Sequence, residues 1–194
     1  MAGHVPLLRR RREGVTDFRA RKKAVSSQST LLVVRVSNKN VSSQFLMPKV
    51  KGDEVLSSAH SRQLLKFGWT GSTKSTPACY LLGLLAGKKA QAKGVKEAVL
   101  YNGVVPFIRG SRIAAFVKGV VDSGVSMAVD QEVLPSQERV TGKTISDFAA
   151  NLAKEDKEAY KARFSAMIKG GFKPEDYPAL FEKTKAAITA GAKK

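Results

Sequence analysis

The sequence predicts an α/β fold, in which a mixed β-sheet is packed with helices, preceded by a basic arm and followed by a helical extension. Three observations favour it. Residues 31–61 contain short β-branched or alternating segments separated by turn residues. Segments typical of helices then alternate with short apolar segments, and the pattern is helical from residue 134 onward. We therefore expect three regions, an arm, a core and an extension, at residues 1–30, 31–130 and 131–194.

The first region has few large apolar side chains and no sustained periodicity, which is typical of an arm. Two basic clusters lie in it, Arg9–Arg12 and Arg19–Lys23. The second cluster is compatible with a helix, because four side chains lie close to one helical face: Val15, Phe18, Lys22 and Val25. Such arms often become ordered only when they bind RNA.

A β-meander is expected over residues 31–61. Residues 31–36 are short and β-branched, as in a buried strand, and residues 37–40 resemble a turn. In residues 41–47, Val, Ser, Phe and Met alternate with Ser, Gln and Leu, which predicts a second strand that Pro48 ends. Residues 54–61 resemble a third strand.

A helix is then expected to begin after Thr76, a residue suited to the N-cap, with Pro77 at the first helical position. It is expected to run to about residue 93, where Gly94 stops it. Gly83 and Gly87 are four residues apart, so we expect another backbone to approach that helical face closely.

The rest of the core is expected to contain strands at residues 95–101 and 125–129, with a helix capped by Ser111 between them. In the extension, Thr144 and Asp147 have the spacing of a capping box. Gly170 is expected to end a helix whose apolar side chains share one face: Tyr160, Phe164, Met167 and Ile168. Pro178 is expected to open a final helix.

Charge gives the first functional signal. The chain has 34 Lys and Arg against 16 Asp and Glu, a net charge of +18, which indicates a polyanionic partner. The excess is densest in residues 1–30. The longest strongly apolar stretch, Tyr80–Ala86, is far shorter than the roughly 20 residues that cross a bilayer. No secretory signal is recognisable at the start, so nucleic acid is favoured over a membrane.

No catalytic or metal-binding set emerges from the reactive residues. His4 and His60 are 56 positions apart, and the single cysteine, Cys79, excludes an intramolecular disulfide and fits a reducing cytoplasm. The loop at residues 68–75 resembles a phosphate-binding loop, but Thr73 stands where that motif needs glycine. Acids in the core region are few and scattered. We expect no cofactor, no metal, no small-molecule substrate and no enzymatic activity.

Three side chains in and beside the first strand are candidates for contact with a partner: Arg35, Asn38 and Lys39. A charged side chain within an apolar strand points either to solvent or to a partner. RNA lying against that sheet face and a simple exposed arginine are equally compatible with the pattern. Trp69 likewise suits either a base-stacking or a core position.

Four stretches resemble a known family. They occur in family order over most of residues 6–130: RRRREGVTDF at 9–18; VRVSNKNV at 34–41, continued by GDEVLSSAHS at 52–61; FGW at 67–69, leading into YLLGLLAG at 80–87; and EAVLYNG at 97–103. The sequence resembles the archaeal form of large-subunit ribosomal protein family eighteen. Residues 171–178 are similar to the helical extension of archaeal and eukaryotic members, whereas residues 102–107 depart from the family pattern.

The resemblance implies an RNase-H-like layered α/β core in a cytoplasmic protein of the ribosome. It implies a structural role: binding 5S rRNA and attaching it to the 23S-type rRNA in the central protuberance, among neighbouring ribosomal proteins of the large subunit. His60 belongs to a family string without an implied catalytic role. The implied RNA contacts are Arg9, Arg10, Arg11, Arg12, Arg19, Arg21, Lys22 and Lys23 in the arm, and Arg35, Asn38 and Lys39 near the first turn.

From the residues alone, two alternatives to an RNA-binding structural protein stay open. One is a metal-dependent nuclease on a similar α/β scaffold, which needs three or four acids gathered on the sheet. The other is a DNA-compacting protein, which requires only the basic charge.

Overall fold

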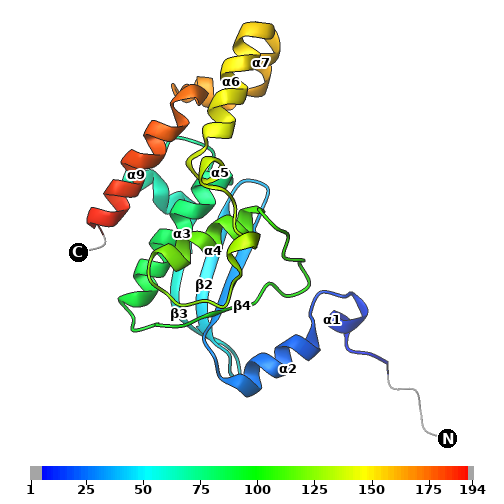
Figure 1. The fold of residues 1–194 in the computed structure, drawn as a ribbon. Coiled ribbons are helices and arrows are strands. Elements are labelled where there is room, and N and C mark those ends of the chain that lie inside the picture. Colours follow the sequence, from blue (N-terminus) through cyan, green and yellow to red (C-terminus); the bar gives the residue numbers. More distant parts are fainter. Residues whose placement is uncertain (1–5, 192–194) are drawn as a thin grey trace, which may run out of the picture.

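A four-stranded mixed sheet organises the structure, a computed structural model that describes residues 6–191 (Figure 1). The strands are β1 (Leu31–Val36), β2 (Val41–Met47), β3 (Glu54–His60) and β4 (Val99–Leu100), in the spatial order β3-β2-β1-β4. The first three are antiparallel neighbours, and β4 is parallel to β1. The predicted α/β class is thus confirmed. His4, one of the two histidines considered above, lies outside the described residues.

The strands of the meander follow their predicted positions with one irregularity. Ser37 and Asn40 close the first turn, in which the Ser37 amide donates to the Asn40 carbonyl at 2.8 Å. The register between β2 and β3 shifts between Phe45 and Leu46. Phe45 and the next residue, Leu46, are both buried, because Phe45 packs in the main core and Leu46 packs with Ala24 and Leu31 on the opposite face of the sheet.

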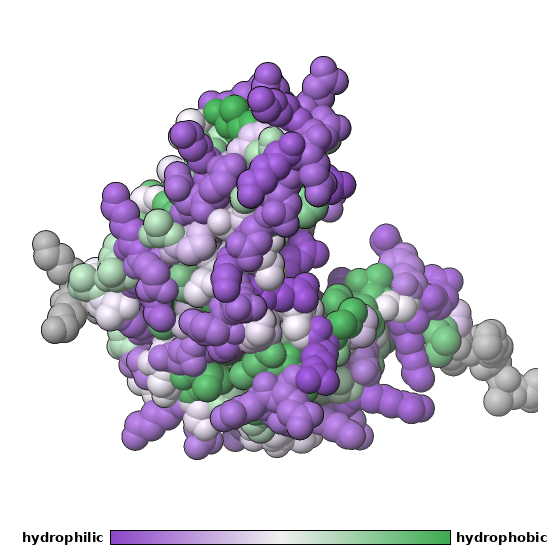
Figure 2. Space-filling view, turned by 45° about the horizontal axis from the view of Figure 1, so that its top comes forward, coloured by the Kyte–Doolittle hydropathy of each residue, from purple (hydrophilic) through white to green (hydrophobic). Residues whose placement is uncertain are grey.

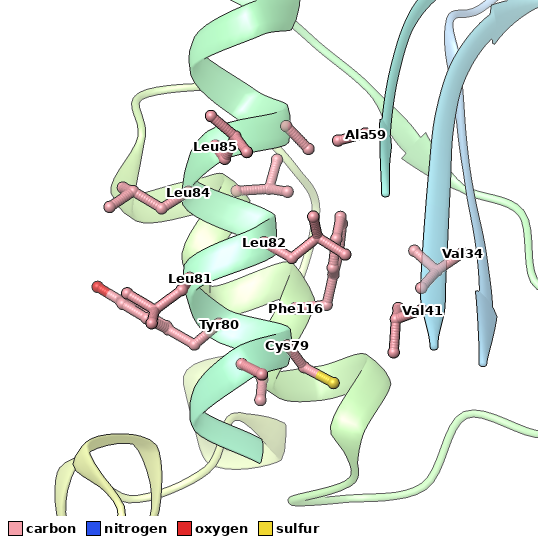
Figure 3. Close-up of a cluster of buried hydrophobic side chains, with 14 of the residues drawn as sticks. Val34, Val41, Ala59, Cys79, Tyr80, Leu81, Leu82, Leu84, Leu85 and Phe116 are labelled. Carbon is pink, nitrogen blue, oxygen red and sulfur yellow. The ribbon is translucent and has the colours of Figure 1, made fainter. Parts of the chain in front are cut away.

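Two helices, α3 (Thr76–Gln91) and α4 (Arg112–Asp122), cover one face of the sheet (Figure 1). Figure 3 shows Leu82 and Phe116 lying between α3 and the strands that carry Val34 and Val41. The predicted close approach at Gly83 is confirmed, because a Cβ there would lie 2.1 Å from the Phe116 carbonyl oxygen of α4. Glycine therefore lets the two backbones touch.

The helix caps in the core are partly as predicted. Ser111 caps α4 by accepting from the Ala114 amide, as expected. The prediction for α3 was wrong by one residue: Ser75 is the N-cap and Thr76 is already helical. Ser75 Oγ also donates to the Ser72 carbonyl at 2.8 Å, which holds this serine at the helix start.

The two strands predicted after α3 are largely absent from the described residues. Residues 95–101 contribute only the two-residue β4, and residues 125–129 form no strand but a single bridge between Glu97 and Ser126. The chain leaves the sheet soon after β4, because Gly103 turns it with a φ of +64°.

The arm contains two helices, a single turn α1 (Arg9–Arg12) and α2 (Phe18–Ser27). The predicted helix at the second basic cluster is thus confirmed. Asp17 begins α2, since its carboxylate accepts from the amides of the first turn. Ala24 anchors α2 by packing with Leu31 and Leu46. These two side chains lie on the sheet face opposite α3.

The C-terminal third is helical, as predicted: α5 (Gln137–Thr141), α6 (Lys143–Glu155), α7 (Lys157–Arg163), α8 (Ser165–Lys169) and α9 (Tyr177–Gly191). Three short 3-10 helices complete the described elements, at Ser61–Phe67, Gln131–Val133 and Pro174–Asp176. Helices α6 and α7 project from the core, and α9 returns beside α3 (Figure 1). Tyr177 of α9 is fully buried against Trp69, with ring centroids 5.7 Å apart.

Two predictions in this third were wrong. The expected capping box does not exist, because α6 begins at Lys143 after Gly142 and Thr144 lies inside the helix. The helix expected over residues 160–168 is divided into α7 and α8. Phe164 separates them in a non-helical conformation that buries its ring against Tyr160. Among residues 6–191, no helix combines the length and apolar character needed to cross a bilayer.

Candidate nucleic-acid interface

The sheet face opposite α3 and α4 is largely polar. Side chains alternate along a strand, so Leu31, Val33 and Arg35 share this outer face, whereas Leu32 and Val34 enter the main core. Helix α2 covers the Leu31 end of the face. Arg35 at the other end is exposed, and the strand register places it in one cross-strand row with Ser42 and His60. A partner can therefore reach this part of the sheet.

Arg35 is held in place although it is exposed. Its Nη1 donates to the Asn102 carbonyl at 3.2 Å, across 67 residues of sequence. A Cβ added at Gly103 would lie within 3.7 Å of both terminal guanidinium nitrogens. The loop after β4 therefore holds the Arg35 guanidinium group in one position on the outer face of the sheet.

Asn38 and Lys39 are exposed on the tight turn between β1 and β2. The loop at residues 68–75 supports this turn, since Thr73 Oγ1 donates to the Lys39 carbonyl at 2.6 Å. That loop is itself packed into the core. Trp69 is fully buried and donates through Nε1 to Ser72, so its core interpretation is confirmed and its base-stacking alternative is wrong.

Eight basic side chains of the arm are presented from α1 and α2 and differ in how they are engaged. Arg9 pairs with Glu13 at 2.8 Å, and Arg10 Nε donates to Thr16 Oγ1 at 2.9 Å. Arg21 makes a two-bond ion pair with Asp53, which precedes β3 and thereby joins the arm to the core. Its hydrogen bonds to Asp53 raise the pKa of Arg21. The other members are exposed: Arg11, Arg12, Arg19, Lys22 and Lys23.

Several acidic side chains have structural uses. Asp17 and Asp156 cap helices, and Asp53 pairs with Arg21. Asp122 accepts a hydrogen bond from the Tyr80 hydroxyl at 2.7 Å, and burial together with this bond raises the pKa of Tyr80. Within residues 6–191, no three His, Cys, Asp or Glu side chains are grouped in a way that could hold a metal ion.

Three of the predicted contact residues gather around one cleft: Arg10, Arg21 and Arg35. Sequence reasoning did not predict this cleft, nor the roles of Phe18 and Tyr101 in lining it. For Phe18, the local signal in the sequence was an aromatic residue within a basic arm. The other predicted contact residues lie outside this cleft, along the arm and at the first turn.

Hydrophilic side chains cover much of the arm and of the helical projection, and hydrophobic atoms are exposed near the junction of arm and core (Figure 2). Fold and surface together define a basic α/β protein suited to a polyanionic partner. Residues 6–103 match a family described as "Ribosomal large subunit proteins 60S L5, and 50S L18".

Relatives extend the match over nearly the whole chain. It is 44% identical to large ribosomal subunit protein uL18 of Methanothermobacter thermautotrophicus, over 93% of this chain and 92% of the relative. It is 43% identical to the uL18 protein of Aeropyrum pernix, over 93% of this chain and 85% of the relative. For the uL18 protein of Caldivirga maquilingensis the values are 44%, 93% and 87%.

The chain belongs to this family of large-subunit ribosomal proteins. The resemblance drawn from the sequence is thus confirmed. The protein is a structural constituent of the large ribosomal subunit, and its place is the ribosome in the cytoplasm.

Proposed function

We propose that the protein binds 5S rRNA and helps to attach it to the 23S-type rRNA in the central protuberance of the large subunit. The observation that carries the proposal is the continuity of the basic arm with the outer face of the sheet. The Arg21–Asp53 pair and the packing of Ala24 hold α2 against the core, so that both surfaces face one partner. Family membership supports rRNA as this partner.

We further propose the contact residues. In the arm they are Arg9, Arg10, Arg11, Arg12, Arg19, Arg21, Lys22 and Lys23, and on the core they are Arg35, Asn38 and Lys39. Arginine presents a planar fork of donors that matches phosphate oxygens, which suits the exposed guanidinium groups of α1. Arg9 and Arg21 would have to exchange or share their carboxylate partners on binding, so we expect them to contribute less than Arg11 and Arg12.

We infer a purely structural role without catalysis. Asp17 caps a helix and Asp53 is an ion-pair partner, and His60 Nδ1 accepts from the Arg62 amide at 3.2 Å. A nuclease would need several acids that converge on one point. We also propose that the chain is divided into three regions, with boundaries at residues 30 and 130. Incubation of 5S rRNA with the protein and Mg²⁺ should leave the RNA intact.

Binding of the full-length protein to 5S rRNA, with tRNA as competitor, tests the proposal. We expect a preference for 5S rRNA at every salt concentration and an affinity that falls steeply with salt, because each phosphate contact contributes roughly 0.7–0.9 to the slope of log K against log salt. Equal affinity for 5S rRNA and tRNA would overturn the proposed partner. Equal affinity for duplex DNA would favour the DNA-compacting alternative.

A charge variant tests the contact surface. Replacing Arg9–Arg12 with glutamine should lower the magnitude of the salt slope by up to about 3–4, from four lost phosphate contacts. The control removes two charges far from the arm, through Lys157→Gln together with Lys161→Gln on α7, in the projection formed by α6 and α7 (Figure 1). An unchanged slope in the arm variant would show that these side chains do not contact RNA phosphates.

A further inference from the structure

A cleft lies between the arm and the core, with a volume of about 330 Å³. Its walls come from the end of α1, the turn at Thr16, the start of α2, β1 and the loop after β4. This volume falls within the roughly 300–1,000 Å³ of pockets that hold small organic ligands. The arm and the sheet therefore enclose a space suited to one group of nucleotide size. This space is distinct from the exposed basic surface of the arm.

The charge of this cleft favours a phosphate. Three guanidinium groups line it, from Arg10, Arg21 and Arg35, together with the Asp17 carboxylate. Arg21 is paired with Asp53, so the positive charge offered to a ligand comes from Arg10 and Arg35. The Asp17 carboxylate is already committed to the α2 cap, where it accepts from two backbone amides. Arg10 Nε donates to Thr16, and Arg35 Nη1 donates to the Asn102 carbonyl. Each guanidinium group is therefore oriented by a hydrogen bond to the protein. Fixed forks of this kind bind phosphate with little loss of side-chain freedom.

Two aromatic side chains line the same cleft, Phe18 and Tyr101. Phe18 is the first residue of α2 and keeps 38% of its surface exposed, and among residues 6–191 it belongs to neither core cluster. Tyr101 is half-buried against the small apolar cluster of Ala24 and Leu31. Aromatic rings beside arginines are the surroundings in which proteins stack unpaired RNA bases.

The residue between two lining residues of the cleft carries an unsatisfied polar atom. Among the described side chains, Asn102 Oδ1 is the buried atom without a hydrogen-bond partner, and Asn102 stands between the lining residues Tyr101 and Gly103. Its amide group donates to the Val105 carbonyl at 2.7 Å, which fixes the orientation of the side chain. A buried acceptor of this kind costs stability unless a donor reaches it. The hydroxyls and amino groups of a nucleotide are such donors.

A second basic hollow adjoins the cleft at the same turn. Both hollows share Thr16, Asp17 and Phe18, and the second is lined by Arg11, Arg19 and Lys22. Adjacent phosphates of one strand can thus follow the arm from one hollow into the next. This continuity favours a nucleotide within an RNA chain over a free mononucleotide.

We propose that the arm–core cleft binds one unstacked nucleotide of the bound rRNA, with its phosphate on Arg10 and Arg35 and its base against Phe18 or Tyr101. The inference rests on the proposed function and adds to it the recognition of an unpaired base. Phosphate contacts to the arm would set the overall affinity, whereas the cleft would select RNA in which a nucleotide can leave the stack.

Alanine variants of the two aromatic residues test the cleft in the full-length protein, with 5S rRNA as probe. Phe18→Ala, Tyr101→Ala or the double variant should weaken binding of 5S rRNA by about 5- to 100-fold. Stacking of one base on an aromatic ring contributes an affinity of that size. The salt slope should stay unchanged, since no phosphate contact is lost. Tyr101→Phe should retain stacking. Phe148→Ala, an exposed aromatic of α6 outside the cleft, is the matched control and should bind as the parent does.

The readouts separate a local role from loss of folding. Phe18 belongs to neither core cluster of the described residues, so Phe18→Ala should keep the parent's melting temperature even if Tyr101→Ala does not. Ultraviolet cross-linking of the parent complex should join an unpaired nucleotide to Phe18 or Tyr101. Parent-like affinity of the Phe18→Ala, Tyr101→Ala double variant, or cross-links confined to other regions, would overturn the cleft inference alone. Failure of the parent to prefer 5S rRNA would instead contradict the proposed function.

Discussion

The contact between α3 and α4 depends on glycine, and Gly119→Ala tests that dependence. A Cβ built on Gly119 lies 2.2 Å from the Tyr80 carbonyl oxygen and 2.9 Å from the Leu84 amide nitrogen. Both are backbone atoms of α3, so no side chain can move aside. Alanine therefore requires the helices to separate until the shorter distance reaches the 3.4 Å of an ordinary contact.

Two opposing contributions set the size of the effect. Alanine gains about 1 kcal/mol over glycine in helix propensity. Inserting a methyl group into a closely packed core costs about 1–3 kcal/mol, with the upper part of that range expected where backbone must move. We therefore expect a net loss of about 1–2 kcal/mol in the free energy of unfolding. In a protein of this size, that loss lowers the melting temperature by about 2–8 °C.

Urea unfolding followed by the fluorescence of Trp69 measures this loss, because the chain has a single tryptophan and that side chain is fully buried. The matched control is Gly191→Ala at the end of α9. Its Cβ would lie 3.1 Å from the Phe67 ring, a side chain that is able to rotate away. We expect the control to change stability by no more than about 0.5 kcal/mol.

Equal urea midpoints for Gly119→Ala and the parent would refute the reasoning. A second glycine in the same contact between α3 and α4 provides another test. A Cβ on Gly83 would lie 2.1 Å from the Phe116 carbonyl oxygen of α4. Once one alanine has separated the helices, the second has less to displace. The Gly83→Ala, Gly119→Ala variant should thus lose less than the sum of the single losses.

Three further predictions concern the first turn of α3 and its surroundings. Ser75→Ala should cost about 0.5–2 kcal/mol in thermal unfolding as the loss of an N-cap, and an equal cost for Thr76→Ala would place the cap where the sequence suggested. Burial raises the pKa of the Cys79 thiol from 9.0 to about 12, so iodoacetamide at pH 8 should label it only after unfolding, and rapid labelling of the native protein would contradict its burial. Because the unfolded thiol loses its proton first, this group should lower stability as pH rises above about 9. Tyr177→Phe removes the acceptor for the Ser72 amide, 3.1 Å away, and should cost about 1–3 kcal/mol, a cost that parent-like stability would disprove.

Local signals in the sequence were sufficient for much of the fold. Ser111 caps α4 and glycine marks the contact of the two helices, because each feature depends on residues close together in the chain. Features that depend on distant partners were not predictable. The register shift at Phe45 and Leu46 depends on how β2 pairs with β3, and the spacing of Thr144 and Asp147 could not show that α6 starts earlier.

The candidate site divides in the same way. The order of residues was enough to find the basic clusters, and to find Arg35 as a charged residue within a β-branched strand. The partners of these side chains were not visible. Arg21 pairs with Asp53 across 32 residues, and Arg35 bonds to Asn102 across 67. The cleft arises from these long-range contacts, so only the folded chain reveals it.

The return of α9 to the core sets an order of events during synthesis. The hydrogen bond between Ser72 and Tyr177 spans 105 residues, and translation takes about 5–20 s to cover that distance. The arm emerges well before α9 is made, so a nascent chain exposes its polycation while the apolar surface around Trp69 still lacks its cover. Exposed apolar surface of this kind makes an incomplete chain prone to aggregation. Timely docking of α9 would thus determine how much newly made protein survives to reach the ribosome.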